Sequence, residues 1–277
     1  MTEKFEIIRS SQNKYVSLVR SLEDKKGREK NSLFRFDGVK LACEAVRKGV
    51  KLSFILLDEG ALEAVLDKAE KLYGVGLLNI GCKVVVVESS LFARLSDEMA
   101  PEGIISVAEY MADRCSTCLG EELRVSEKEN IVLLESVRDP SNVGAIIRAA
   151  AAFGADRIVM SHDCADVYNS KTIRASMGTV FSVKITRVDD IKSAIATLRS
   201  GSRRVFAAAL DRDAKKLGEI EIKDGDCILI GNEGHGLSKE AIDASDSSVF
   251  IPMREGVESL NAATAAAVLM WEFFGSR

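Results

Sequence analysis

The chain has 277 residues, 47% of them hydrophobic and 29% charged, which is the composition of a globular protein with two ordinary domains or one large one. No apolar run approaches about 20 residues, and the charged start MTEKFEIIRSS has no signal-peptide core, so we expect a cytoplasmic protein without a membrane segment. The net charge of −4 argues against a surface coated with nucleic-acid-binding charge.

The first part of the sequence predicts a small α/β domain. A helix is expected over residues 5–30, and from Phe34 onward short apolar runs alternate with helical patterns. This alternation with short loops predicts βα units around a small, mostly parallel sheet. The expected strands are LSFILLD, KVVVVE and GIISVAEY, and the expected helices cover residues 38–48, 61–73 and 90–99.

Basic residues are concentrated at the N-terminal end of the chain. Residues 1–51 hold 13 Lys+Arg and 7 Asp+Glu, whereas the remaining 226 residues hold 25 and 35. A basic end on an acidic protein suits a polyanion that approaches from that end. A solvated helix face explains the same charge, so charge alone leaves both interpretations open.

The segment ADRCSTCLGEELRVSEKE, residues 112–129, loses the periodicity and gathers polar residues. We expect the domain boundary here. The predicted organisation is an N-terminal domain with a helical extension over residues 1–115, a linker over residues 116–128 and a second domain over residues 129–277.

Six cysteines are spread along the chain, and CSTC at Cys115–Cys118 has the C-x-x-C spacing of metal and redox sites. A zinc site would need two further ligands, but a second C-x-x-C is absent and the only histidines are His162 and His235. A coincidence within a linker explains the spacing better than a metal or redox role. We therefore expect reduced thiols and no bound metal.

The second part of the chain repeats the alternation of strands and helices. IVLLESV, residues 131–137, is a continuous apolar strand, as expected where helices cover both faces of a sheet. Because ligands gather at the carboxyl ends of the strands in open α/β sheets, the loops there are candidate sites. Further strands are expected at 157–161, 180–185, 204–209, 226–230 and 248–251, and alanine-rich helices at 143–153 and 259–274.

The first candidate loop, RDPSN, leads into the alanine-rich helix that carries Arg148. Asp139, Ser141 and Asn142 can cap this helix, which by itself would explain them. A guanidinium on an alanine-rich packing face is costly unless an anion or a carboxylate meets it. Arg148 is therefore expected either in a structural salt bridge or in a site that binds an anion.

The second loop, GNEGHGLS, contains three glycines together with Glu233 and His235. A phosphate-binding P-loop would need a lysine, and a dinucleotide fingerprint would follow the first strand of its unit, so neither motif fits. A ligand contacted by bare backbone amides fits this loop better, and a simple tight turn is the alternative.

The third loop follows Ile251-Pro252 and contains Ser259, Leu260 and Asn261. Ser259 is the predicted N-cap of the last helix, because its hydroxyl could accept a hydrogen bond from an amide of the first turn. Leu260 is a large apolar residue between two polar ones at the mouth of this helix. A flat apolar ligand resting on Leu260 would explain its presence.

In this order and spacing, the three loops resemble the motifs of the SpoU/TrmH family of SPOUT RNA ribose 2′-O-methyltransferases. The segment KTIRASMGTVF is similar to a further family segment, and FRFDG with LACEAVRKG is similar to the ribosomal-protein-like RNA-binding domain of rRNA-modifying members. The first motif is matched by Asn142, Gly144, Ile146, Arg148, Ala150, Phe153 and Gly154, the second by Gly231 to Ser238, and the third by Ile251 to Met253 and Ser259 to Asn261.

The resemblance implies an α/β fold, with a C-terminal SPOUT domain built on a trefoil-knotted, mostly parallel sheet and a small α/β RNA-binding domain before it. It implies S-adenosylmethionine as cofactor, held in a bent pose by Gly231, Ile251 and Leu260 together with Ile230 and Asn232. It also implies a homodimer that acts on RNA, for which large-subunit (23S) rRNA is the expected substrate.

By the family pattern, Arg148 acts on the ribose 2′-hydroxyl, and Glu233 is the expected partner of its guanidinium. Asn142, Ser259 and Asn261 are expected to help orient Arg148, the nucleotide and the cofactor. Because a guanidinium stays protonated at neutral pH, stabilising a phosphate or the developing alkoxide is the alternative to acting as a base. Other open alternatives are a tRNA 2′-O-methyltransferase, a SPOUT enzyme that methylates a base nitrogen, and a non-catalytic RNA-binding or assembly factor.

Overall fold

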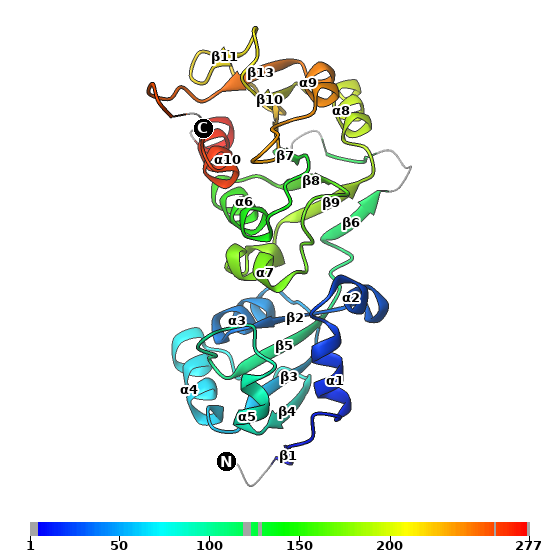
Figure 1. The fold of residues 1–277 in the computed structure, drawn as a ribbon, viewed down its shortest axis with the longest axis vertical. Coiled ribbons are helices and arrows are strands. Elements are labelled where there is room, and N and C mark those ends of the chain that lie inside the picture. The colour runs from blue at the N-terminus through cyan, green and yellow to red at the C-terminus, as the bar shows by residue number, and fades with distance from the viewer. Residues whose placement is uncertain (1–4, 119–122, 127–128, 258, 276–277) are drawn as a thin grey trace. The chain divides into compact units, whose positions relative to one another are not determined.

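The computed structural model describes residues 5–118, 123–126, 129–257 and 259–275, so part of the expected linker 116–128 lies outside the described residues. The chain forms two compact units (Figure 1). Unit 1 comprises Met1–Met111 and Asp166–Phe181, and unit 2 comprises Ala112–Ala165 and Ser182–Arg277. In the described parts of the chain, no helix combines the length and the apolar character needed to cross a membrane.

Unit 1 is built on a five-stranded mixed sheet with the strand order β1-β4-β3-β5-β2. β4 pairs in parallel with β1 and β3, whereas β5 pairs antiparallel with β3 and β2. Four of the five strands therefore run in one direction, as the prediction of a mostly parallel sheet expects, and β5 alone runs against them. The loop that precedes β5 does not reveal this reversal in the sequence. The elements are β1 (Ile7–Ile8), α1 (Lys14–Ser21), α2 (Lys25–Asn31), β2 (Leu33–Asp37), α3 (Val39–Arg47), β3 (Leu52–Asp58), α4 (Leu62–Tyr73), β4 (Lys83–Val87), α5 (Ser89–Ala93), β5 (Ile104–Glu109), α7 (Ser170–Ser176) and η2 (Thr179–Phe181).

The sheet of unit 1 has a core on each face, as the alternation of side chains along β3 shows. Phe54 and Leu56 pack with residues of α1 and α5, whereas Ile55 and Leu57 pack with residues of α3 and α4. All four side chains are at most 2% exposed. The continuous apolar run LSFILLD is therefore explained by helices on both faces.

The predicted single helix over residues 5–30 is wrong, because the segment contains a short strand and two helices. Asn13 caps α1 by accepting a hydrogen bond from the backbone amide of Tyr15, and Asp24 caps α2 by accepting one from Gly27. Two N-cap side chains start two helices, and the helical periodicity alone does not reveal the break between them.

Unit 2 is built on an eight-stranded sheet in which every pair is parallel, with the order β11-β13-β10-β12-β7-β8-β9-β6. Helices α6 and α10 pack against each other, as do α8 and α9. The trefoil knot stays a prediction. The elements are β6 (Cys115–Cys118), β7 (Ile131–Leu134), α6 (Pro140–Phe153), β8 (Arg157–Ser161), β9 (Lys184–Val188), α8 (Ile191–Ser200), β10 (Val205–Ala208), β11 (Lys215–Lys216), β12 (Cys227–Ile230), α9 (Lys239–Ala244), β13 (Ser247–Phe250), α10 (Ala262–Met270) and η3 (Trp271–Gly275).

Two segments of unit 2 differ from the prediction. The strand expected at residues 180–185 begins only at Lys184, because a 3₁₀ turn occupies Thr179–Phe181. The polar segment expected as a linker contains the edge strand β6, which pairs with β9, and the hydroxyls of Ser116 and Thr186 are 3.2 Å apart. A short edge strand made of polar residues carries no apolar alternation that would reveal it.

The parallel pairing places the carboxyl ends of β13, β10, β12 and β7 next to one another at one edge of the sheet. The loops that follow β7, β12 and β13 are the three candidate loops of the sequence. The structure therefore brings them together at this edge, as the rule for open α/β sheets requires.

Candidate active site

The loop after β12 folds back on its own backbone. The backbone N–H of Asn232 donates to the carbonyl of Gly236 at 3.1 Å, and the N–H of Gly236 donates back to Asn232 at 2.9 Å. A Cβ at Gly231 would lie 2.5 Å from the carbonyl carbon of Gly236 and 2.6 Å from the backbone nitrogen of Leu237. Close packing within the loop itself therefore requires a glycine at position 231, and contact of its backbone with a ligand stays a prediction.

Both ends of this loop are tied to the segment after β7. The side-chain amide of Asn232 donates to the carbonyl of Ser136 at 2.8 Å. At the other end, Ser238 donates from its backbone N–H and from its hydroxyl to the two carboxylate oxygens of Glu135, at 2.8 and 2.7 Å. Glu135 and Ser136 were not expected in the site, although two polar residues directly after the apolar run IVLL are a visible signal.

Three of the predicted catalytic residues form one hydrogen-bonded group. The side-chain amide of Asn142 donates to Glu233, and the amide of Asn261 donates to the side-chain oxygen of Asn142 at 2.9 Å. They come from α6, the loop after β12 and the loop after β13, so the group joins all three candidate loops. Asn142 is half-buried, and Glu233 and Asn261 are exposed.

Asn261, and not Ser259, is the N-cap of α10. Its side-chain oxygen accepts hydrogen bonds from the backbone amides of Ala263 and Thr264, at 3.0 and 3.2 Å. The helix begins at Ala262, which leaves Ser259 two residues before the cap and exposed. The predicted capping role of Ser259 is therefore wrong. Similarly, Asp139 caps α6 by accepting from the backbone amide of Ser141.

Arg148 lies apart from this group. It is exposed on α6, six residues after Asn142, which corresponds to about 9 Å along the helix axis and about 120° around it. Within the described residues Arg148 has no hydrogen bond or ion pair, so the structural salt bridge is not found there. Glu233 bonds Asn142 instead of Arg148, so the expected Arg148–Glu233 pair is wrong within one chain.

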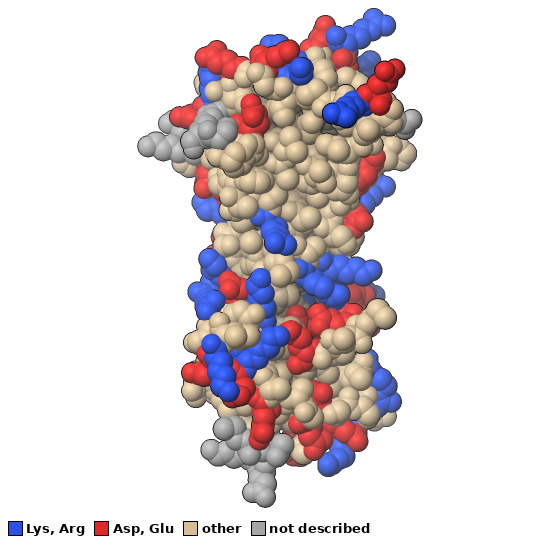
Figure 2. Space-filling view, turned by 90° about the vertical axis from the view of Figure 1, so that its left-hand side faces the viewer, with Lys and Arg blue, Asp and Glu red and all other residues tan. Residues whose placement is uncertain are grey.

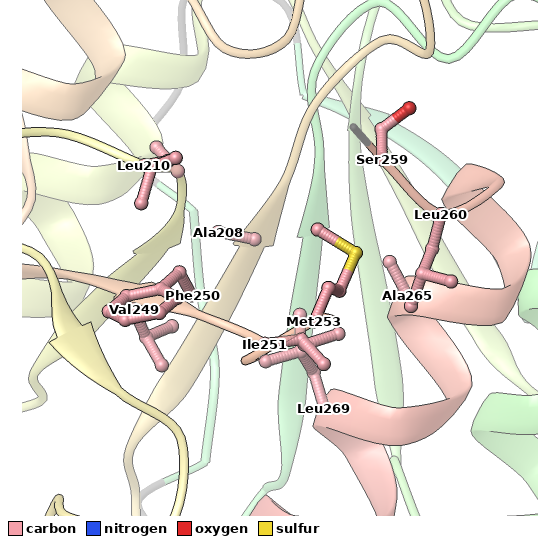
Figure 3. A pocket seen from close by; sticks show the side chains of 11 residues that line it. Ala208, Leu210, Val249, Phe250, Ile251, Met253, Ser259, Leu260, Ala265 and Leu269 are labelled. Carbon is pink, nitrogen blue, oxygen red and sulfur yellow. The ribbon is translucent and has the colours of Figure 1, made fainter. Parts of the chain in front are cut away.

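An apolar pocket of about 230 Å³ lies beside the amide–carboxylate group, at the ends of β10 and β13 and along α10 (Figure 3). Of the predicted residues, Ile251, Ser259 and Leu260 line this pocket. Figure 3 shows the side chains of Ile251, Leu260 and Leu269 between the end of β13 and α10. Ile230 is buried at the end of β12 and, like Gly231 and Asn232, does not line the pocket. The residues that were not predicted are Ala208, Ala209, Leu210, Val249, Phe250, Met253, Ala265 and Leu269.

The carboxylate of Asp163 stands at the end of β8, next to the segment after β7. Burial raises its pKa, but hydrogen bonds from Ser161, Ser136 and Arg138 outweigh burial and lower the pKa to about 2. Asp163 is therefore an anion throughout the neutral range. No residue between 155 and 170 was expected to take part in the site.

The chain is similar to known proteins in both sequence and fold. Residues 129–271 match the SpoU rRNA Methylase family, and residues 13–106 match the MRM3-like substrate binding domain. The 23S rRNA (guanosine(2553)-2′-O)-methyltransferase RlmP of Bacillus subtilis is 27% identical over 97% of this chain and 99% of that protein.

Two solved structures hold the cofactor. The AdoMet-bound rRNA methyltransferase from Sinorhizobium meliloti is 27% identical, with a TM-score of 0.79 over 97% of both chains. The SpoU methyltransferase AviRb from Streptomyces viridochromogenes, in complex with AdoMet, is 26% identical, with a TM-score of 0.76 over 94% of this chain and 97% of that one.

Proposed function

The chain belongs to the SpoU rRNA methylase family, and we propose that the RNA it methylates is large-subunit rRNA. It is an S-adenosylmethionine-dependent RNA 2′-O-ribose methyltransferase. The large-subunit target is supported by RlmP, whose name gives a guanosine of 23S rRNA, and by the substrate-binding domain matched at residues 13–106.

The observation that carries this function is the meeting of three loops at one edge of the sheet of unit 2. There the hydrogen-bonded group of Asn142, Glu233 and Asn261 lies beside an apolar pocket. A methyl transfer between a sulfonium and a hydroxyl needs a place for the donor and polar groups that align the acceptor, and this edge offers both.

We propose that Ile251 and Leu260 hold the adenine ring of the cofactor, and that the loop with Ile230, Gly231 and Asn232 closes over it. The pocket fits this group because its walls are mostly apolar, and because a sulfonium cofactor brings its own positive charge and needs no lysine clamp. When bound, the cofactor supplies an electrophilic methyl group. Ser259, exposed at the rim of the pocket, remains available to donate to the substrate or the cofactor.

Arg148 is proposed to act on the RNA. Its exposed guanidinium has the geometry to bind a phosphate through two parallel hydrogen bonds, which would fix the ribose beside the methyl donor. The same charge stabilises the negative charge that the 2′-oxygen gains as its proton leaves for the RNA phosphate or for water, and this charge is neutralised when the oxygen bonds to the methyl carbon and the donor leaves as a neutral thioether. Asn142, Glu233 and Asn261 align the acceptor.

We further propose a homodimer that is formed through α6 and α10. Arg148 shares an exposed helix face with Ala151 and Ala152, at spacings of three and four residues. On α10 and after it, Val268 is 37% and Trp271 54% exposed, and Figure 2 shows that this side of unit 2 is largely uncharged. An uncharged face with an exposed tryptophan is typical of a protein interface. In such a dimer, Arg148 of one chain completes the group of Asn142, Glu233 and Asn261 of the other.

Mixing two inactive variants tests this arrangement. Arg148→Ala and Glu233→Gln each remove one part of the site, so each homodimer is expected to be inactive. In an equal mixture about half of the dimers are hybrids, and each hybrid keeps one intact site of two, so about a quarter of the wild-type activity is expected to return. Differently tagged chains show whether hybrids form, and an Arg148→Ala/Glu233→Gln double variant mixed with Arg148→Ala is the matched control. Hybrids without activity would contradict a site shared between chains.

The substrate is tested by incubating the protein with methyl-labelled S-adenosylmethionine and total RNA. Label is expected in large-subunit rRNA, and digestion is expected to release it as a 2′-O-methylnucleoside. Label in the tRNA fraction, or on a base, would contradict the proposed target. Absence of cofactor binding by calorimetry would favour a non-catalytic RNA-binding factor.

A further inference from the structure

Ser136, the second residue after β7, has a left-handed backbone with a φ of 56°, although it is not a glycine. L residues rarely adopt this conformation unless their surroundings hold them in it. Ser136 is also the residue whose carbonyl accepts the side chain of Asn232. The cause of its conformation therefore bears on the loop after β12.

The end of β8 supplies the groups that hold Ser136. The backbone N–H of Ser136 donates to the hydroxyl of Ser161 at 2.9 Å, and its own hydroxyl donates to one carboxylate oxygen of Asp163 at 2.7 Å. The hydroxyl of Ser161 donates to the other oxygen of Asp163, also at 2.7 Å. Asp163 thus binds Ser136 directly and orients the serine that accepts its amide.

Through its carbonyl, Ser136 is linked to the hydrogen-bonded group of Asn142, Glu233 and Asn261. Asn232 donates to the Ser136 carbonyl, and its own side-chain oxygen accepts from the backbone amides of Gly234 and His235, at 2.8 and 3.2 Å. These contacts form the turn that carries Glu233, and the carboxylate of Glu233 in turn accepts a hydrogen bond from the side-chain amide of Asn142. A continuous chain of hydrogen bonds therefore runs from β8 through the segment after β7 to the loop after β12.

We propose that Asp163 is a positioning residue for methyl transfer: by holding Ser136 in its left-handed conformation, it places the Ser136 carbonyl that orients Asn232 and the loop carrying Glu233. Asp163 does not line the apolar pocket. Its two oxygens together accept from Ser136, Ser161 and Arg138.

A purely structural role for Asp163 makes a different prediction. If the carboxylate only stabilised the junction of β7 and β8, its loss would lower the melting temperature but leave the folded enzyme fully competent. A positioning role predicts that protein lacking the carboxylate is still folded but has lower cofactor affinity and lower turnover. It also predicts that this loss disappears when residue 136 adopts the left-handed backbone conformation without the support of Asp163. Glycine adopts a left-handed backbone without help, so Ser136→Gly provides this second condition.

The experiment measures Asp163→Asn alone and in the Ser136→Gly background. For Asp163→Asn we expect a loss of about 10- to 100-fold in kcat/KM for label transfer to RNA, and weaker cofactor binding by calorimetry. Relative to Ser136→Gly, the double variant is expected to lose only about twofold. Asp190→Asn is the matched control, because Asp190 is a carboxylate that follows the neighbouring strand β9, where it caps α8 and has no hydrogen bond to the β12 loop within the described residues. The activity of this variant is expected to stay unchanged.

Several outcomes would overturn the proposal. Wild-type kcat/KM in folded Asp163→Asn would leave only a structural role, and an equal loss with and without Ser136→Gly would show that the backbone of Ser136 is not the link. If Asp163→Asn alone does not fold, the double variant decides, since a double variant that also fails to fold contradicts the role of the Ser136 backbone.

The inference rests on the proposed use of the β12 loop in the cofactor site, and calorimetry without RNA separates the two. Wild-type protein that binds no cofactor would count against the function, whereas wild-type binding that Asp163→Asn leaves unchanged would count against the inference.

Discussion

Adding one methyl group at Gly231 is expected to disable the loop after β12, which is proposed to close over the cofactor, whereas the same addition at Gly234 is not. In Gly231→Ala the new Cβ would lie 2.5 to 2.6 Å from backbone atoms of Gly236 and Leu237. Backbone cannot turn away as a flexible side chain can, so the two strands of the loop must separate by about 1 Å to reach ordinary contact.

The cost follows from what that separation breaks. The two hydrogen bonds between Asn232 and Gly236, now 2.9 and 3.1 Å long, would stretch beyond bonding distance, at about 1 kcal/mol each. Overpacking against backbone adds about 1–3 kcal/mol. A closed loop destabilised by roughly 3–5 kcal/mol becomes the minor state, and we expect the cofactor Kd to rise on the order of 30-fold or more.

Gly234→Ala is the matched control in the same loop. Its new Cβ would meet only the side-chain oxygen of Asn232 at 3.4 Å, an ordinary contact, and its φ is not in the left-handed region. Calorimetric titration with the cofactor and thermal unfolding are measured for both variants. Equal cofactor affinity of Gly231→Ala and Gly234→Ala would refute the claim that close packing at Gly231 shapes the β12 loop for cofactor binding.

Arg148→Ala is expected to abolish label transfer while cofactor binding and melting temperature stay near wild type. The reason is that, within the described residues, the Arg148 side chain has no hydrogen-bond or ion-pair partner that its removal would leave unpaired. Activity near wild type in this variant would contradict the proposed role of Arg148. Ala265→Leu places a larger side chain in the apolar pocket, so calorimetry is expected to show lost cofactor binding in a folded protein, and unchanged affinity would place the cofactor elsewhere. Burial raises the pKa of Glu129, but hydrogen bonds from Arg157 and Lys184 outweigh it and lower the pKa from 4.5 to about 2. The stability contributed by Glu129 is therefore complete above about pH 4.5 and lost as pH falls through about 2, so urea unfolding of Glu129→Gln is expected to vary less with pH in that window.

The sequence was sufficient to predict which loops meet. Strands that alternate with helices predict a parallel sheet, parallel strands end at one edge, and the polar residues after three of them therefore lie together. Asn142, Glu233 and Asn261 are brought into contact as this reasoning expects. Ile251 and Leu260 likewise line one pocket, since both follow the same strand.

The order of the strands and the backbone conformation of Ser136 could not be predicted from the sequence. β10 lies between β12 and β13, which brings Ala208 to Leu210 into the pocket, but crossovers of similar length allow other orders. The role of Asp163 depends on a left-handed φ at Ser136, and a serine in the sequence does not predict this backbone conformation as a glycine would. Asn261 caps α10 in place of Ser259 because the helix starts two residues later than the polar pattern suggests.

The exposure of the site residues in one chain bears on how the reaction is catalysed. Arg148, Glu233 and Asn261 all face solvent, where a charge stabilises an alkoxide far less than it does in a site from which water is excluded. Preorganised electrostatic stabilisation therefore requires something to cover this edge of the sheet. In the dimer proposed above, a second chain would cover one side of this edge through the largely uncharged face of unit 2 seen in Figure 2, and the RNA would cover the other. On this reasoning the single chain is expected to bind the cofactor, because the proposed pocket lies within one chain, whereas methyl transfer is expected to fall with dilution as the proposed dimer dissociates. A turnover rate per chain that stays constant far below the dissociation constant of the dimer would show that one chain suffices.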